Sequence, residues 1–526
     1  MVDAARFKRS ALTHLWLLPI LLAALWLRVS GIMQEHLYGD EAEYAIVARY
    51  LSRDMTYLAY PDIASMGAVP FVSQPPLILY TMAISMKIFG ATDFAALLPS
   101  ILFGVATVGV VYAIGHRLGG RMMALGASTI LAALPFHVEL SRRAMLDSGY
   151  VFFLTLTAYF CIAWMQDRSR IAAVGVGVAT ACAALSKLPG VLAGPIVLLV
   201  FGLGLILAIV QKNKAQIKET AIQGAIGAGV VAIGAGLYLG LLSYLDATRN
   251  LMTKLQWQFG RVDTSHAVVQ EMAAVERAPS WYFTDPKMSF QHELMPLVFA
   301  IAIVGLLAVL VRLALPRTRR AEDAVIPIFA LVLGAFFLYS DRKEGFYLLP
   351  FAPLAAILVA YAADSLRKLL AWGGVRLAPA GTRGVAVAAL ALGIVLVAAP
   401  AYAAASKTVD HFVYGNDQEK YFGSGTKEAA AFIHERDPEA AQYGTLLGRF
   451  SLHWYNEQTS YHWYIDHTFV ESQVKAGKLK YVVYEDYLNL AFDREYMKDL
   501  IDRYHGTAVQ SYRNGWGEVT VFELHP

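Results

Sequence analysis

Cysteine and charge are both scarce in this chain of 526 residues. The two cysteines, Cys161 and Cys182, lie inside apolar runs, so we expect buried thiols and no disulfide. Charged residues make up 16% and the formal net charge is +3, which gives no basic excess for nucleic acid binding. Hydrophobic residues make up 57% and the mean hydropathy is +0.47, values too apolar for an ordinary soluble enzyme.

Signals of cleavage and of internal duplication are also missing. The first apolar run lacks a small-residue cleavage site, so we interpret it as a retained helix, not a signal peptide. A secondary transporter typically shows repeated halves and ionisable groups in mid-span. No repeat relates the halves of this chain, and its deepest charge, Arg28, lies near the outer end of the first run. We also find no Trp-Trp-Asp element or paired outer histidines that would favour an oligosaccharyltransferase or an O-antigen ligase.

Long apolar runs dominate residues 1–404. Each has the roughly 20 residues that a helix needs to cross a hydrocarbon core about 30 Å thick. The loops between them are alternately rich in Lys and Arg, which predicts eleven spans with a cytoplasmic N-terminus. The predicted spans are 12–33, 93–115, 121–138, 148–166, 171–186, 188–210, 219–244, 294–311, 323–339, 346–363 and 384–404. Residues 77–89 are apolar but short, and we expect an amphipathic helix along the outer interface there.

The composition changes after the last apolar run. Residues 405–526 are polar and aromatic, with a helical pattern at 426–436 and strand patterns at 480–484 and 518–524. About 100 residues are enough for one core, so we expect a small α/β domain, outside the cytoplasm by parity. The predicted fold class is therefore an all-α polytopic membrane bundle with a C-terminal α/β extracytoplasmic domain.

Acidic residues gather directly after the first span. Asp40 and Glu41 are adjacent, and Asp40, Glu43 and Tyr44 share one face if a helix begins here. A carboxylate held at a membrane interface can accept a proton from an attacking hydroxyl. The alternative is a helix start whose acidic first turn only favours the helix dipole.

Cations occur on the predicted outer side, against the positive-inside trend. They are Arg142 and Arg143 between the third and fourth spans, Lys187 between the fifth and sixth, and Arg342 and Lys343 before the tenth. Such cations can hold phosphate oxygens. The alternatives are lysines and arginines that anchor to lipid headgroups, or a solvated, self-paired turn. A base and cations on one side would suit sugar transfer from a polyprenyl-phosphate donor, whose leaving phosphate gains negative charge.

Five short motifs follow one another in a set order. They are 39–44 (GDEAEY), 74–77 (QPPL), 143–147 (RAMLD), 186–187 (SK) and 343–353 (KEGFYLLPFAP). In this order and on one predicted side, they resemble the C-type (GT-C) glycosyltransferases, most closely the branch of the protein O-mannosyltransferases and the lipid A aminoarabinose transferase. The resemblance covers roughly residues 10–365, and the C-terminal domain carries no matching motif.

The resemblance implies a bundle of 11–13 helices and inverting transfer from a polyprenyl- or dolichyl-phosphate sugar. Asp40 matches the catalytic carboxylate of the first loop, and Asp147 matches a second acidic residue. Glu41 could share the role of Asp40, and the sequence does not separate them. Some relatives bind a divalent metal, for which His36, Asp40, Glu41 and Asp147 are candidates, although no cofactor is required.

The same resemblance places basic residues near the donor phosphate. Arg143, Lys187 and Lys343 match such positions, and Tyr347 matches a site tyrosine. The expected partners are a polyprenyl-phosphate sugar, a glycan, lipid or protein acceptor, and membrane lipids, but no nucleic acid. The expected location is a bacterial inner membrane. A polytopic transporter or flippase for a lipid-linked sugar remains the alternative.

Overall fold

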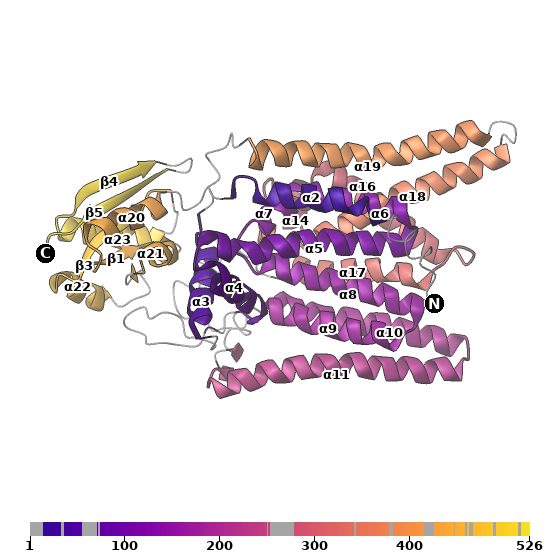
Figure 1. Ribbon diagram of the computed structural model, residues 1–526, viewed down its shortest axis with the longest axis horizontal. Helices are drawn as coiled ribbons and strands as arrows, with labels where there is room; N and C mark the ends of the chain where they lie inside the picture. Colours follow the sequence, from indigo (N-terminus) through magenta and orange to yellow (C-terminus); the bar gives the residue numbers. More distant parts are fainter. Residues whose placement is uncertain are drawn as a thin grey trace.

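The computed structural model has a long helical bundle with a small α/β domain at one end (Figure 1). The structure describes residues 14–32, 36–54, 71, 74–249, 251–252, 278–340, 343–377, 382–414, 425–445, 448–457, 460–461, 467–487, 491–513 and 517–526.

The bundle contains most of the helices. Its long helices are α2 (Leu17–Val29), α5 (Asp93–Gly119), α6 (Arg121–Ala133), α7 (Pro135–Ser141), α8 (Asp147–Asp167), α9 (Arg170–Ser186), α10 (Ala193–Val210), α11 (Lys214–Tyr244), α16 (Pro296–Ala314), α17 (Val325–Tyr339), α18 (Phe351–Leu377) and α19 (Thr382–Phe412). Short helices between them are η2 (Leu188–Leu192), α14 (Trp281–Thr284), α15 (Phe290–Glu293), η3 (Ala321–Ala324) and η4 (Gly345–Leu348).

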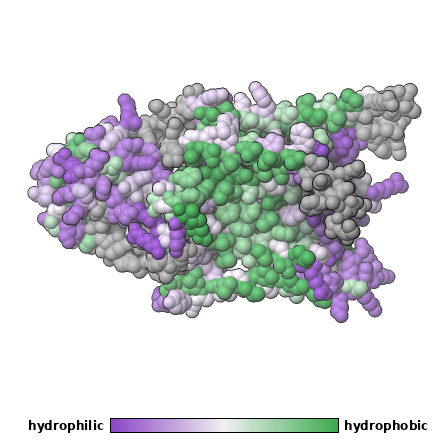
Figure 2. Space-filling model, in the orientation of Figure 1, coloured by the Kyte–Doolittle hydropathy of each residue, from purple (hydrophilic) through white to green (hydrophobic). Residues whose placement is uncertain are grey.

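An apolar belt surrounds the bundle. Figure 2 shows hydrophobic side chains over its middle, with hydrophilic side chains at both ends. Within the described part of the chain, seven helices are long and apolar enough to cross a membrane, or eight if the bent pair α6–α7 forms one span. Each of the eleven predicted ranges overlaps a helix in the described part of the chain. The chain is an integral membrane protein, and the count of eleven spans stays a prediction.

Glycines let neighbouring helices approach closely. A Cβ atom at Gly305 of α16 would lie 2.0 Å from the Leu358 carbonyl oxygen of α18, well inside van der Waals contact. Only glycine permits such an approach, which is common where helices pack in lipid.

Two helices lie across the end of the bundle that faces the α/β domain (Figure 1). They are α3 (Asp40–Asp54) and α4 (Leu77–Phe89), so the helix predicted at 77–89 is confirmed. Ile78, Leu79 and Met82 of α4 are fully buried in one cluster with Ala45 of α3. This apolar contact fixes α3 on the bundle.

The C-terminal domain is built on a five-stranded sheet in the order β2-β1-β3-β5-β4, in which β1 is parallel to β2 and β3, and β5 is antiparallel to β3 and β4. Its elements are α20 (Thr426–Arg436), β1 (Ala441–Gly444), α21 (Gly448–Asn456), β2 (Ser460–Tyr461), α22 (His467–Lys475), β3 (Leu479–Glu485), α23 (Ala491–Arg503), β4 (Thr507–Arg513) and β5 (Glu518–Glu523). The helix predicted at 426–436 and the strands predicted at 480–484 and 518–524 are confirmed.

Helix α21 docks the C-terminal domain onto the helices at the end of the bundle. Its Phe450 and Trp454 are buried in the same apolar cluster as α3 and α4. The Trp454 indole donates to Asp93 Oδ1 at 2.7 Å, and Arg49 of α3 donates to the Trp454 carbonyl oxygen at 3.0 Å. Helices α3 and α4 therefore lie between the bundle and the C-terminal domain.

Candidate functional site

The acidic motif forms a helix start. Gly39 has a φ of 56°, a left-handed conformation that glycine adopts without strain, and α3 begins at Asp40. The Glu43 amide donates to the Gly39 carbonyl oxygen at 3.0 Å. Asp40, Glu41 and Glu43 all lie in the first turn, where the helix dipole favours negative charge. Asp40 is exposed, so its carboxylate is accessible to a substrate.

Tyr44 lies where three parts of the predicted site meet. Its side chain is buried, and that burial raises the pKa of the Tyr44 phenol well above its ordinary value. The charges of Asp40, Glu43 and Asp147 raise this pKa further, as does Tyr347. Residues from the first loop, the start of α8 and η4 are thus electrostatic neighbours.

A buried ion pair joins two of the predicted residues. Lys187 Nζ donates to both carboxylate oxygens of Asp147, at 2.8 and 2.7 Å. The side chains are 7% and 4% exposed. Because desolvating two charges is costly, such a pair persists only with close geometry. The Lys187 ammonium also lies 5.0 Å from the centre of the Phe346 ring.

The backbone conformation around Lys187 directs its side chain toward Asp147. Helix α9 ends at Ser186, and Lys187 is extended (φ −155°, ψ 150°) before η2 begins. A Cβ atom at Gly190 would lie 1.8 Å from the Ala183 carbonyl oxygen, so η2 can fold back against α9 only with glycine there. The predicted alternative, a lysine that reaches out to lipid headgroups, does not fit this buried geometry.

The second lysine, Lys343, lies just before η4, and the tyrosine, Tyr347, lies within it. Lys343 is 3% exposed, and its Nζ donates to the Ser340 carbonyl oxygen at 2.5 Å. The Tyr347 ring stacks on Phe337, with ring centres 5.6 Å apart. Lys343 is thus folded into the end of the bundle. It is not a solvated surface charge.

Arg143 connects the first loop to acids that the sequence reasoning missed. It pairs with Glu139 at 3.0 Å, and its Nε lies 3.9 Å from Glu41 Oε1. Glu41 also accepts from the Ala144 amide at 3.3 Å. Burial, together with the charge of Glu139, raises the pKa of Glu293 to about 8. No motif marks Glu139 of α7 or Glu293 of α15, which come from distant parts of the sequence.

Other predicted residues do not join this group. Arg142 is buried, and its guanidinium donates to the carbonyl oxygens of Leu27 and Ser30 at 3.0 and 2.6 Å. It satisfies the C-terminal carbonyl groups of α2, so we leave it out of the proposed phosphate-binding set. Arg342 lies outside the described residues.

The geometry gives no support to a metal at the predicted position. Among the described residues, no three His, Cys, Asp or Glu side chains lie close enough to hold one ion. The candidates His36, Asp40 and Asp147 therefore do not form a ligand set, and Lys187 engages both Asp147 oxygens.

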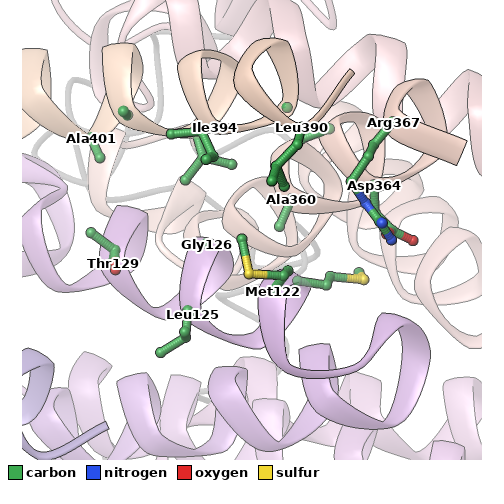
Figure 3. A pocket seen from close by; sticks show the side chains of 15 residues that line it. Met122, Leu125, Gly126, Thr129, Ala360, Asp364, Arg367, Leu390, Ile394 and Ala401 are labelled. Atoms are coloured by element: carbon green, nitrogen blue, oxygen red, sulfur yellow. The ribbon is translucent and has the colours of Figure 1, made fainter. Parts of the chain in front are cut away.

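A hollow of about 240 Å³ lies elsewhere, between α6, α18 and α19 (Figure 3). Its walls are apolar, with Met122, Leu125 and Ile394 among them, and Asp364 and Arg367 lie at one end. None of the predicted site residues lines it.

Comparisons with known proteins agree with the motifs. Residues 73–234 match the family model described as dolichyl-phosphate-mannose-protein mannosyltransferase. YkcB and YycA of Bacillus subtilis, two candidate mannosyltransferases, are each 29% identical to this chain, over 143 and 140 residues. The matched segment is 27% of this chain and spans 20% of the length of each relative.

Solved structures match over a much larger share of the chain. ArnT from Cupriavidus metallidurans, bound to undecaprenyl phosphate, superposes with a TM-score of 0.65 at 18% identity and covers 97% of this chain and 98% of its own. The oligosaccharyltransferase AglB from Archaeoglobus fulgidus, in complex with an inhibitory peptide and a dolichol-phosphate, has a TM-score of 0.60 at 14% identity and covers 90% of this chain and 69% of its own. The predicted resemblance is therefore confirmed: the chain has the fold of the GT-C glycosyltransferases, and its residues 73–234 match the mannosyltransferase family model.

Proposed function

We propose that this protein is an inverting glycosyltransferase that moves a monosaccharide from a polyprenyl-phosphate donor to an acceptor at the outer face of the membrane. The acceptor is a glycan, a lipid or a protein. The observation that carries the proposal is the buried Asp147–Lys187 pair, at one end of the apolar belt. It lies beside Phe346 of η4 and directly after residues 144–146, which share one buried cluster with Tyr44 of α3.

The position of this site suits a lipid-linked substrate. A polyprenyl chain partitions into the apolar belt, which leaves its phosphate at the polar edge where α3 lies (Figures 1 and 2). The matching structures of ArnT and AglB contain bound undecaprenyl phosphate and dolichol-phosphate, respectively. A polyprenyl phosphate is therefore the donor class that we assign to this chain.

Asp40 is the proposed base. The acceptor hydroxyl oxygen attacks the anomeric carbon from the face opposite the phosphate, and the hydroxyl proton passes to the Asp40 carboxylate. Exposure at the start of α3 leaves this carboxylate open to the acceptor. Glu41 differs, since it contacts the Ala144 amide and lies near Arg143, so we assign it to holding the loop.

Lys187 and Lys343 are the proposed stabilisers of the leaving group. As the bond between the anomeric carbon and the phosphate oxygen breaks, its electron pair stays on the phosphate, which gains a negative charge. A lysine has three N–H donors, and Asp147 takes two from Lys187, which leaves one for a phosphate oxygen. Asp147 fixes the ammonium, and a fixed cation stabilises charge that develops in a transition state.

We further propose that the chain crosses the membrane eleven times, with the N-terminus in the cytoplasm. The C-terminal domain and the site share one end of the bundle (Figure 1), which the positive-inside pattern assigns to the outside. In a bacterium this would be the periplasmic side of the inner membrane.

The test is turnover in detergent micelles with a radiolabelled polyprenyl-phosphate sugar and a mixture of candidate acceptors. A transferase releases polyprenyl phosphate and labels the acceptor. A micelle has no second side, so a flippase yields neither product. Intact donor after incubation with folded protein and acceptor would contradict the proposal.

A further inference from the structure

A buried carboxylate lies where the C-terminal domain meets the first outer loop. Glu485, at the end of β3, accepts from Thr426 Oγ1 and Thr445 Oγ1 at 2.5 Å each, and from the Tyr38 hydroxyl at 3.0 Å. These four residues, the Glu485 cluster, are each at most 8% exposed. These hydroxyl donors, together with the Tyr487 side chain, stabilise the buried carboxylate.

The domain is shaped to accommodate this carboxylate. Thr445 precedes α21 and also accepts from the Gly448 amide at 3.0 Å. A Cβ atom at Gly448 would lie 2.9 Å from Glu485 Oε2, so glycine leaves room for the carboxylate at the start of α21. That helix start favours negative charge. Burial raises the pKa of Glu485, and the hydroxyl donors oppose that rise.

The partner on the bundle side is the turn that starts α3. Tyr38 is two residues before Asp40, and its carbonyl oxygen accepts from the Glu41 amide at 3.2 Å. The C-terminal domain also holds the backbone of Leu37: its amide donates to the Tyr455 hydroxyl, and its carbonyl oxygen accepts from Ser451, both at 2.8 Å. Gly39 then provides the left-handed turn into α3. The domain thus contacts the chain up to the residue before that glycine.

We propose that Glu485 is a positioning residue for the transfer reaction: through the Tyr38 hydroxyl it fixes the turn that presents Asp40 to the acceptor. This inference rests on the proposed function, because it gives the C-terminal domain a role in the chemistry of the bundle. Without the Tyr38 contact, the backbone can change conformation more easily at Gly39, directly before the proposed base Asp40. Misplacing a catalytic group by about 1 Å can lower a rate by about 10²-fold.

Tyr38→Phe is the direct test, since it removes one hydroxyl and keeps the ring. We expect kcat to fall about tenfold, with the KM for the donor within about twofold of the wild type. Thr426→Val is the matched control: the same carboxylate loses one hydroxyl donor, but from inside the domain. We expect kcat within about twofold of the wild type for this variant. Unchanged kcat in Tyr38→Phe, or an equal loss in Thr426→Val, would overturn the proposal.

Conservative rescue adds a second criterion. Glu485→Gln keeps an oxygen that accepts from Tyr38 and gains an amide that donates to the Thr426 hydroxyl, so we expect kcat within about threefold of the wild type. Glu485→Leu keeps neither hydrogen bond, and we expect its kcat to fall at least as far as that of Tyr38→Phe. Equal losses in Glu485→Gln and Glu485→Leu would contradict positioning by hydrogen bonds.

Hydrogen–deuterium exchange over residues 37–47 separates this inference from the proposed function. We expect faster exchange at the Glu41 and Glu43 amides in Tyr38→Phe than in the wild type or in Thr426→Val. If the wild type turns over no lipid-linked sugar, the proposed function fails, and exchange still shows whether Tyr38 fixes the turn. Unchanged exchange at both amides would overturn the positioning role, whatever the activity.

Discussion

Removing the charge of Lys187 separates a structural from a catalytic role of its ion pair with Asp147. Both side chains are almost fully buried, and Lys187 meets both carboxylate oxygens at 2.7–2.8 Å. Lys187→Met leaves Asp147 buried without its cation, and Asp147→Asn leaves the lysine without its anion. Loss of one partner of a buried pair costs about 3–5 kcal/mol, because the remaining charge is uncompensated.

The double variant Lys187→Met/Asp147→Asn removes both charges. Neutral replacement of a buried pair is often close to neutral in stability, so we expect the double variant to unfold within about 1 kcal/mol of the wild type. Activity should not recover. Lys187→Met and the double variant lose the cation, and Asp147→Asn leaves it without the carboxylate that fixes it. We therefore expect kcat to fall about 10²–10³-fold at saturating donor in all three variants.

Reversible unfolding in mixed micelles, followed by tryptophan fluorescence, and turnover on the same samples measure the two effects. A double variant that regains both stability and turnover would show that the pair only holds η2 against α8. Single variants as stable as the wild type would show that the pair is not buried in the native protein.

The remaining predictions concern the base, a second acid and the topology. Asp40→Asn should lower kcat about 10²–10⁴-fold in a folded protein; normal turnover there, with loss in Glu41→Gln, would transfer the role to Glu41. The pKa of Glu293 is raised from 4.5 to about 8 in the folded protein, so its stabilising contribution is fully present below the unfolded pKa. This contribution is lost as the pH rises through about 8, so the melting temperature of the wild type should fall between pH 5 and pH 9. It should fall less in Glu293→Gln, and an equal fall in both proteins would refute this prediction. A reporter fused after residue 405 should read out as periplasmic and one at residue 214 as cytoplasmic. If both reporters lay on the same side of the membrane, the prediction of eleven spans would be wrong.

Local patterns in the sequence were sufficient to predict much of the fold. Helix α20 occupies the predicted residues 426–436, and α4 occupies 77–89, because periodic apolar side chains in each sequence mark the buried face. No local pattern predicts the order of the strands in the sheet. Strand β1 lies between β2 and β3, and parallel strands are joined by crossover connections. Pairings of this kind depend on contacts between distant residues.

The candidate site was predicted in its residue types and only partly in its geometry. Asp147 and Lys187 are 40 residues apart, and nothing local indicates that they pair. Arg142 and Arg143 are neighbours in sequence, but successive residues of a helical turn point in different directions. Arg142 therefore meets the carbonyl groups of α2, while Arg143 meets Glu139. No sequence motif indicates the proposed role of Glu485, because its hydrogen-bond donors come from separate elements.

Binding of undecaprenyl phosphate tests most directly whether the proposed cation site, at the end of the bundle near the C-terminal domain, holds a lipid phosphate. Native mass spectrometry of the purified protein, titrated with undecaprenyl phosphate or with the uncharged undecaprenol, measures the preference for phosphate. We predict that the wild type binds the phosphate at least about tenfold more tightly than the alcohol, and that Lys187→Met/Asp147→Asn loses most of this preference. Equal affinity of the wild type for both lipids, or a full preference in the double variant, would contradict this account of the site.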